Sequence, residues 1–164
     1  MIQKLLLLFI LTIPFLANAQ ENNDCMEKKD FLIIHSGKDY KSALKVAQKA
    51  SKSLNIKLDL RELSPVSDTA IGLSFPYYTC KSIYEDLTSS DTCCYIARGR
   101  ADDGNYISIE YSSAYSSFAR GYYIVVVSSG LKTSSSMKSL LTKVKTKFKD
   151  AYIKSSVIYV CCMF

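Results

Sequence analysis

Six cysteines are the residues of this sequence best suited to chemistry. They are Cys25, Cys80, Cys93, Cys94, Cys161 and Cys162. An even number of cysteines predicts disulfides in an exported chain, whereas a reducing compartment would indicate metal or redox chemistry. No CxxC motif occurs, and adjacent cysteines chelate a metal poorly, so a Cys-rich zinc site is the weaker reading. We therefore predict disulfides, with no metal and no other cofactor.

The other reactive side chains are one histidine, two arginines and two aspartates. His35 is the only base that a Ser-His-Asp or Cys-His arrangement could use, and no GxSxG-type nucleophile turn accompanies it. Arg98 and Arg100 could grip a carboxylate or a phosphate bidentately, although Asp102 and Asp103 offer them ordinary surface ion pairs. These aspartates lack the ligand spacing of a calcium loop. We predict that the protein is not an enzyme.

Tyrosines are concentrated in the middle of the chain. Tyr combines a flat apolar face with a hydroxyl, which suits sugars and protein interfaces, although core packing explains most tyrosines in any domain. Seven of the twelve lie between residues 63 and 121: Tyr77, Tyr78, Tyr84, Tyr95, Tyr106, Tyr111 and Tyr115. The ligand-binding residues that we predict from this region are Tyr95, Arg98, Arg100, Tyr106, Tyr111 and Tyr115.

The N-terminus indicates the compartment. Residues 1–19 combine Lys4, an apolar run over 5–16 and a small-x-small pattern over 17–19, which predicts a cleaved secretory signal peptide. The run is too short for a membrane span, which needs about 20 apolar residues. Removing 19 of the 164 residues leaves 145, and losing Lys4 lowers the net charge from +6 to +5. We expect one domain over 20–164, in the periplasm or outside the cell, without a membrane span.

Two segments of the mature chain repeat one pattern, and they must position these side chains. Residues 31–37, FLIIHSG, and residues 124–130, IVVVSSG, are apolar runs typical of strands buried on both faces, and each ends in a Ser-Gly turn. A helical stripe follows each run: Leu44, Ala47, Ser51 and Leu54 in the first, and Met137, Leu140, Leu141, Val144 and Phe148 in the second. Each stripe leads to a further predicted strand, over 56–63 and 151–160.

Two β-α-β units in tandem predict an α+β fold of the ferredoxin-like split βαβ type, in which two helices cover one face of a four-stranded antiparallel sheet. The chain divides into a first unit over 30–62, an insertion over 63–121 and a second unit over 122–164. We expect the sheet order 4-1-3-2, with the strands near Phe31 and Ile124 side by side at its centre. The insertion should contain a hairpin, because CYIARG and NYISIEYS flank a turn that ends in Asp103-Gly104.

The same topology predicts how the cysteines pair. The last strand should run antiparallel to the first, which brings Cys25 beside Cys161 or Cys162 and allows a bridge that ties the termini together. Within the insertion, Cys80 should pair with Cys93 or Cys94. The remaining members of the two adjacent pairs would then form a third bridge.

The two repeats also resemble a known family. Residues 121–153, GYYIVVVSSGLKTSSSMKSLLTKVKTKFKDAYI, resemble the second half of a SPOR (sporulation-related repeat) domain, with an aromatic-led strand, a small-residue turn, a striped helix and a strand that opens on 150–153. Residues 30–60 resemble the first half. Members of that family are bacterial envelope modules that bind peptidoglycan glycan strands on the sheet face opposite the helices. The long insertion departs from the pattern, and folding over that face would block the groove.

The resemblance implies an exported envelope module that binds peptidoglycan glycan without catalysis. The alternative is a protein-binding adaptor, inhibitor or immunity-type protein on the same fold, with an envelope protein as its partner. The mild positive charge suits an anionic cell surface, and we predict no nucleic-acid partner. Binding to purified peptidoglycan sacculi, with and without amidase treatment that strips the stem peptides, separates these functions.

Overall fold

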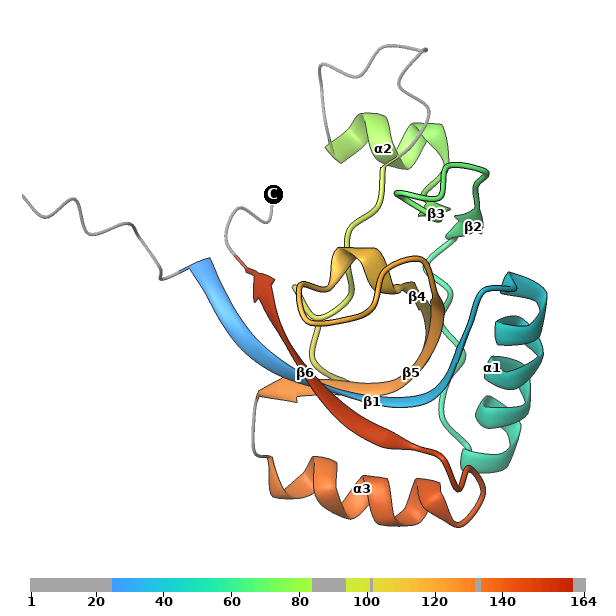
Figure 1. The fold of residues 1–164 in the computed structure, drawn as a ribbon, viewed down its shortest axis with the longest axis vertical. Coiled ribbons are helices and arrows are strands. Elements are labelled where there is room, and N and C mark those ends of the chain that lie inside the picture. Colours follow the sequence, from blue (N-terminus) through green and yellow to red (C-terminus); the bar gives the residue numbers. More distant parts are fainter. Residues whose placement is uncertain (1–24, 84–93, 101, 132–133, 161–164) are drawn as a thin grey trace, which may run out of the picture.

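The chain folds into an α+β structure, which confirms the predicted class (Figure 1). The computed structural model describes residues 25–83, 94–100, 102–131 and 134–160, so the predicted signal peptide lies outside the described residues. The elements, in chain order, are β1 (Met26–Gly37), α1 (Tyr40–Leu54), β2 (Ser64–Pro65), β3 (Leu73–Ser74), α2 (Tyr77–Ile83), β4 (Gly104–Tyr111), the short 3₁₀ helix η2 (Ser112–Ala114), β5 (Tyr123–Leu131), α3 (Ser135–Lys145) and β6 (Tyr152–Tyr159).

The main sheet has the strand order β4-β5-β1-β6, and each neighbouring pair is antiparallel. The two long apolar runs are therefore adjacent central strands, as predicted. Their burial explains this position, because the side chains of Phe31, Leu32 and Ile33 in β1 are completely buried. In β5 the residues Val125–Val127 are equally buried. Apolar side chains on both faces favour the centre of a sheet that is covered on both sides.

The predicted strand over 56–63 is wrong. This segment contributes only one parallel bridge, Leu58 to Ile107, outside the edge strand β4. The chain then turns, because Arg61 and Glu62 adopt left-handed backbone conformations with φ of 52° and 60°. The backbone N–H of Arg61 donates to the side chain of Asp59, which closes the turn. Strand β4, from the insertion, occupies the place beside β5 that we had assigned to this segment.

The predicted hairpin is half wrong. NYISIEYS does form a strand, β4, but CYIARG has no strand among its described residues, and Arg98–Arg100 form a turn. β4 pairs with β5 instead, through the connection over 112–122. The insertion also contains the small β2–β3 pair and helix α2, neither of which the sequence pattern indicated.

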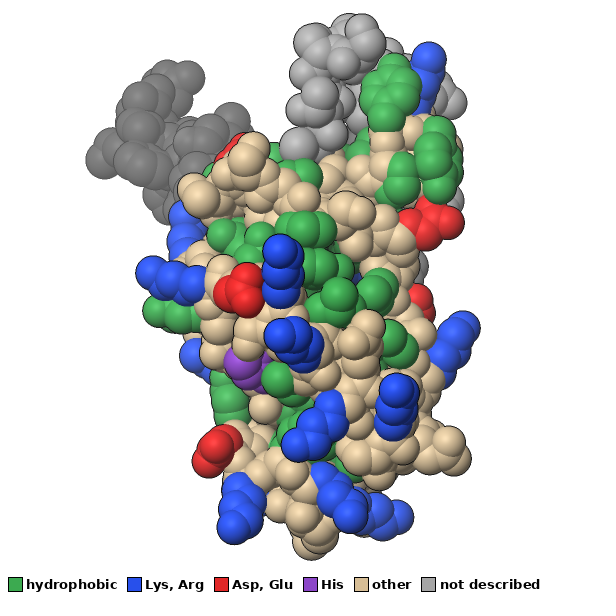
Figure 2. All heavy atoms as spheres, turned by 90° about the vertical axis from the view of Figure 1, so that its right-hand side faces the viewer, with side chains coloured by type: hydrophobic (Ala, Val, Ile, Leu, Met, Phe, Trp, Pro, Cys, Tyr) green, Lys and Arg blue, Asp and Glu red, His purple; other side chains and the backbone are tan. Residues whose placement is uncertain are grey.

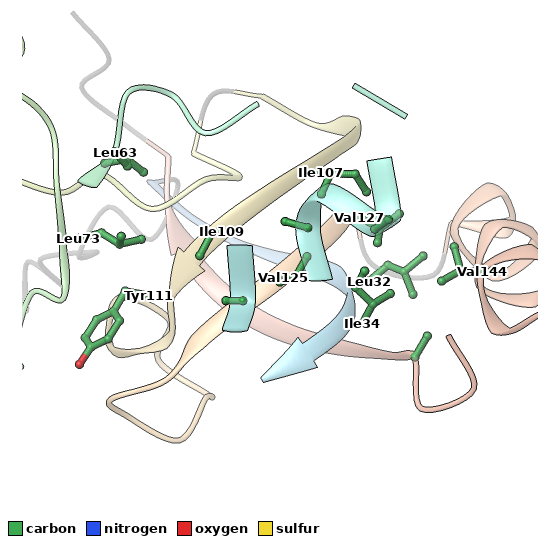
Figure 3. Packing of buried hydrophobic residues seen from close by; sticks show 14 of the residues in the cluster. Leu32, Ile34, Leu63, Leu73, Ile107, Ile109, Tyr111, Val125, Val127 and Val144 are labelled. Carbon is green, nitrogen blue, oxygen red and sulfur yellow. The ribbon is translucent and has the colours of Figure 1, made fainter. Parts of the chain in front are cut away.

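Helices α1 and α3 pack on one face of the sheet and bury the larger core there (Figures 1 and 3). Asp39 caps α1 by accepting hydrogen bonds from the backbone N–H groups of Lys41 and Ser42. The most buried residues of α1 are Ala43, Ala47 and Ala50, whose small side chains let the helix lie close to the strands. In α3 the buried contacts come from Met137 and Val144 of the predicted stripe.

The insertion covers the opposite face of the sheet and forms a second core there. The ring of Phe31 points to this side and meets the rings of Tyr115 and Phe118 at centroid distances of 5.0 and 6.0 Å. Gly99 lies so close to Phe31 that an added Cβ would be 2.9 Å from its ring. The sheet face opposite the helices is therefore covered by the protein's own chain.

A disulfide joins Cys80 in α2 to Cys94, which confirms one of the two predicted partners. Cys25 is also disulfide-bonded, and its backbone carbonyl accepts a hydrogen bond from the N–H of Val160 at 2.7 Å. The start of β1 therefore lies beside the end of β6, as the topology predicted. The cysteines proposed for the other bridges, Cys93, Cys161 and Cys162, lie outside the described residues.

Candidate functional site

Most of the predicted binding residues meet inside the protein. Tyr106, Tyr111, Tyr115 and Arg98 are each at least nine-tenths buried, and Tyr95 is half-buried. Tyr106 and Tyr115 belong to the core between the sheet and the insertion, whereas Tyr111 belongs to the core on the helix side and Tyr95 packs against that core. A ligand-binding role for these residues stays a prediction. Their burial shows that they pack in the interior of the protein.

The centre of this cluster is a completely buried carboxylate, Glu110 of β4. Its Oε2 accepts hydrogen bonds from Arg61 Nη2 at 2.8 Å and from the Tyr95 hydroxyl at 2.6 Å, and the backbone N–H of Arg98 adds a third at 3.2 Å. The Tyr115 hydroxyl lies 3.3 Å away. Among the described residues, Oε1 has no hydrogen-bond partner.

Arg98 connects this centre to the edge of the sheet. Its guanidinium donates to the Asp59 carboxylate at 2.7 Å and to the Asp59 carbonyl at 3.2 Å, and it lies 3.7 Å from the ring centroid of Tyr106. Burial acts to raise the pKa of Asp59, but Arg98 outweighs it and the pKa is lowered. Arg98 Nε also lies 2.8 Å from Asp102, without hydrogen-bond geometry.

These contacts join Arg61 and the 95–98 segment of the insertion to strand β4 of the sheet. Burial acts to lower the pKa of Arg61, but Glu110, Tyr95, Tyr115 and Asp102 together outweigh it, so the pKa is raised and the guanidinium stays charged. The Arg61 guanidinium also donates to the carbonyl of Ile96 in the insertion. The buried Glu110 carboxylate accepts hydrogen bonds from Arg61, Tyr95 and Arg98, so it holds the 59–61 turn and the 95–98 segment against β4.

The buried tyrosines should make the fold sensitive to alkali. Burial raises the pKa of Tyr95 and Tyr115 well above the usual value, with Glu110 adding to the effect, and burial also raises the pKa of Tyr106. The folded state thus holds these phenolic protons more tightly than the unfolded chain, in which tyrosine titrates near about pH 10. The stabilisation is complete below that pH and is lost as the pH rises further.

We expect a fraction of the tyrosinate absorbance to appear only together with loss of the circular dichroism signal, in a pH titration above about pH 10. The conservative Tyr95→Phe variant should show a smaller coupled fraction. Complete tyrosine ionisation before any change in the circular dichroism signal would contradict this expectation.

A pocket of about 280 Å³ opens at the end of the central strands, where β1 and β4 end and β5 begins. The residues that line it are Lys38, Val66, Thr69, Gly72, Tyr111, Arg120, Gly121 and Tyr123. The rings of Tyr111 and Tyr123 form one wall, with centroids 5.1 Å apart and planes tilted by 57°. Their hydroxyls donate to the carbonyls of Thr69 and Gly72, so both rings are fixed in place.

Glycine is required where this wall meets the 66–72 loop. Gly72 adopts a left-handed φ of +65°, and an added Cβ would lie 2.3 Å from the ring of Tyr111. The backbone of the loop therefore lies directly against the aromatic ring. This close contact holds the loop and the strand end together as one rigid wall.

Two exposed cations flank the aromatic wall. Lys38 directly follows β1, which includes the Ser36-Gly37 pair predicted as a turn, and Arg120 precedes β5. Neither forms an ion pair among the described residues, in contrast with the buried arginines. Asp39, the adjacent acid, is occupied in capping α1. The Lys38 ammonium lies over the ring of Tyr122, 5.6 Å from its centroid. The pocket thus offers fixed aromatic surface and two exposed positive charges, which suits a ligand with both an apolar ring face and an anionic group.

Of the predicted residues only Tyr111 lines this pocket. Lys38, Arg120 and Tyr123 were missed, because they are distant in sequence and only the strand order brings them together. The available signal was that both cations flank strand ends, where loops carry function. Two other predicted residues, Tyr95 and Arg100, line a separate hollow of about 210 Å³ near the end of β6.

Comparisons of the chain with protein-family models, with curated proteins and with solved structures each found no match. Within the described ranges, no three His, Cys, Asp or Glu side chains gather in a way that could hold a metal ion. The helices in the same ranges are too short or too polar to cross a membrane.

Proposed function

We propose that the protein is an exported, non-enzymatic module of the cell envelope that binds peptidoglycan glycan strands, and that the strand-end pocket holds the ligand. The observation that carries the proposal is the pairing of the fixed Tyr111–Tyr123 wall with the exposed charges of Lys38 and Arg120. Tyrosine rings stack on sugar faces, and the two cations suit a carboxylate on the sugar. The SPOR-like resemblance supports the same ligand class.

The covered face of the sheet changes where the ligand binds. In a SPOR-like module the groove lies opposite the helices, but here the insertion packs there against Phe31 and Ile33. The pocket at the strand ends is the alternative place for the ligand. We also infer that the fold is a ferredoxin-like split βαβ in which β4 replaces the second strand, since β4 occupies that position in the sheet.

Binding to purified sacculi tests the proposal. Amidase removes the stem peptide from muramic acid and leaves a free carboxylate on the sugar, so we expect stronger binding after amidase treatment. The Lys38→Ala/Arg120→Ala variant should bind the treated sacculi about tenfold or more weakly, because each charge-assisted hydrogen bond contributes about 1.5–3 kcal/mol.

The Lys28→Ala/Lys81→Ala variant is the matched control, because it removes the same charge from exposed positions that do not line the pocket. Equal loss of binding in this control would show a non-specific charge effect. Unchanged binding of the pocket variant would remove the pocket from the proposal.

A protein partner is the second candidate, favoured by two exposed aromatic side chains. Tyr77 and Tyr78 on α2 are 41% and 65% exposed, and the Cys80–Cys94 disulfide anchors this short helix. Exposed tyrosines on a fixed element are typical of the centre of protein interfaces. Protease treatment of the sacculi separates the two candidates, since it destroys a protein partner and leaves the glycan intact.

A further inference from the structure

The outer surface of the helical layer carries a segregated positive charge. Its exposed lysines are Lys41, Lys45, Lys49 and Lys52 on α1, and Lys138, Lys143, Lys145, Lys147 and Lys149 on α3 and the turn after it. The acids of these two segments are Asp39 and Asp150, at their ends. Figure 2 shows basic side chains gathered over the lower half of the face that carries α1.

The lysines of α1 and α3 form no ion pair with any other residue that the structure describes. In contrast, Lys29, Arg61 and Arg98 on the sheet side are all paired with carboxylates. Like charges one helical turn apart destabilise a helix by a few tenths of a kcal/mol for each pair, about 0.2–0.5. Neither α1 nor α3 contains an acidic residue that offsets this repulsion. Binding of an anionic partner would therefore stabilise both helices.

The α1 lysines form a regular row. Lys41, Lys45 and Lys49 are four residues apart and Lys52 follows after three, so all four lie along one side of the helix. The rise of about 1.5 Å per residue separates successive charges by about 6 Å and gives a row of about 16 Å. The row starts next to Lys38, which lines the strand-end pocket.

The chemistry of this surface selects among anionic partners. Every cation on it is a lysine, whose compact and strongly hydrated charge does not stack on bases, and nucleic-acid sites add arginine and aromatic rings. An anionic bilayer is bound more firmly where apolar side chains enter it. The exposed residues between these lysines are polar instead, such as Gln48, Ser135 and Ser139. A hydrated, linear polyanion fits this combination.

We infer that a linear acidic polysaccharide lies along the lysine row of α1, with one of its sugars in the strand-end pocket. The inference rests on the proposed function for the sugar in the pocket, and it adds that successive anionic groups of the chain contact Lys41, Lys45, Lys49 and Lys52. Long chains then bind more tightly than short ones, and their binding weakens as salt increases.

Polygalacturonate and galacturonate disaccharide are suitable probes, because they carry the same carboxylated sugar in a long and a short form. With calorimetry at low and high salt, we expect Lys45→Gln/Lys49→Gln to bind the polymer about tenfold more weakly at low salt, with a shallower salt dependence. Its affinity for the disaccharide should equal that of the wild type. Gln keeps the helix propensity of Lys, and circular dichroism checks the fold.

The matched control is Lys28→Gln/Lys81→Gln, which should leave polymer binding unchanged. Polymer affinity of the Lys45→Gln/Lys49→Gln variant equal to that of the wild type or of this control would overturn the inference, and so would tighter wild-type binding to phosphatidylglycerol vesicles or duplex DNA. Failure of the proposed function appears differently, as absent disaccharide binding in the wild type, and the polymer measurement still decides whether the lysine row binds a polyanion.

Discussion

Glu110→Ala should lower the free energy of unfolding by about 3 kcal/mol or more, the range for breaking a buried ion pair from one side. The substitution leaves the guanidinium of Arg61 and the hydroxyl of Tyr95 without the carboxylate oxygen that both now contact. The side chain of Glu110 is completely buried, so water cannot replace that oxygen without opening the structure. Urea unfolding followed by circular dichroism measures the change.

Two variants control for this prediction. Glu110→Gln keeps the shape and one acceptor oxygen but loses the charge, so we expect an intermediate loss of stability. Glu62→Ala removes an exposed acid that bonds Tyr78 at the surface, and its effect should stay within about 0.5 kcal/mol. An equal effect of Glu110→Ala and Glu62→Ala would show that the buried cluster does not hold the insertion to the sheet.

Removal of the Cys80–Cys94 disulfide should have the next largest effect. The two cysteines are 14 positions apart, and the chain-entropy model gives about 3 kcal/mol for closing a loop of this length. The Cys80→Ala/Cys94→Ala variant leaves Cys25 unchanged, so the bridge at Cys25 is not disturbed. We expect α2 to lose its protection first, because it has little core other than Cys80.

Hydrogen exchange resolved by residue tests this localisation. Amide protection over Tyr77–Ile83 should fall sharply in the variant, while protection in the central strands β1 and β5 should change little. A uniform loss of protection over the sheet would contradict a local role. Unchanged protection in α2 would show that the helix is held by other contacts.

The central strands could be predicted from the sequence because their side chains can be buried in only one kind of position. The runs that begin at Phe31 and Ile124 are apolar on both faces, and only a doubly covered sheet buries both sides. The segment over 56–63 had an alternating pattern that also satisfies a half-buried chain at a sheet edge, so periodicity could not separate the two. The outcome depended on β4, which comes much later in the chain and pairs with β5 in that position.

The site was harder to predict because exposure depends on the whole fold. In β4, Ile107, Ile109 and Tyr111 alternate with Ser108 and Glu110, a pattern typical of a strand with one buried face and one solvated face. The insertion covers the second face, so the polar side became internal and Glu110 required donors from distant segments. The pocket cations gave even less signal, since an isolated lysine or arginine in a loop has no periodicity.

The position of β1 between β5 and β6 has a consequence for the order in which the protein is made. A chain is synthesised from its N-terminus, so β1 is completed at Gly37, but its first sheet neighbour begins only at Tyr123 and its second only at Tyr152. The buried apolar run of β1, residues 31–34, must therefore wait for nearly the whole chain, exposed to aggregation or held by a chaperone. Shortening the C-terminus would accordingly damage the N-terminal strand, because it removes β6 and with it one of the two neighbours of β1.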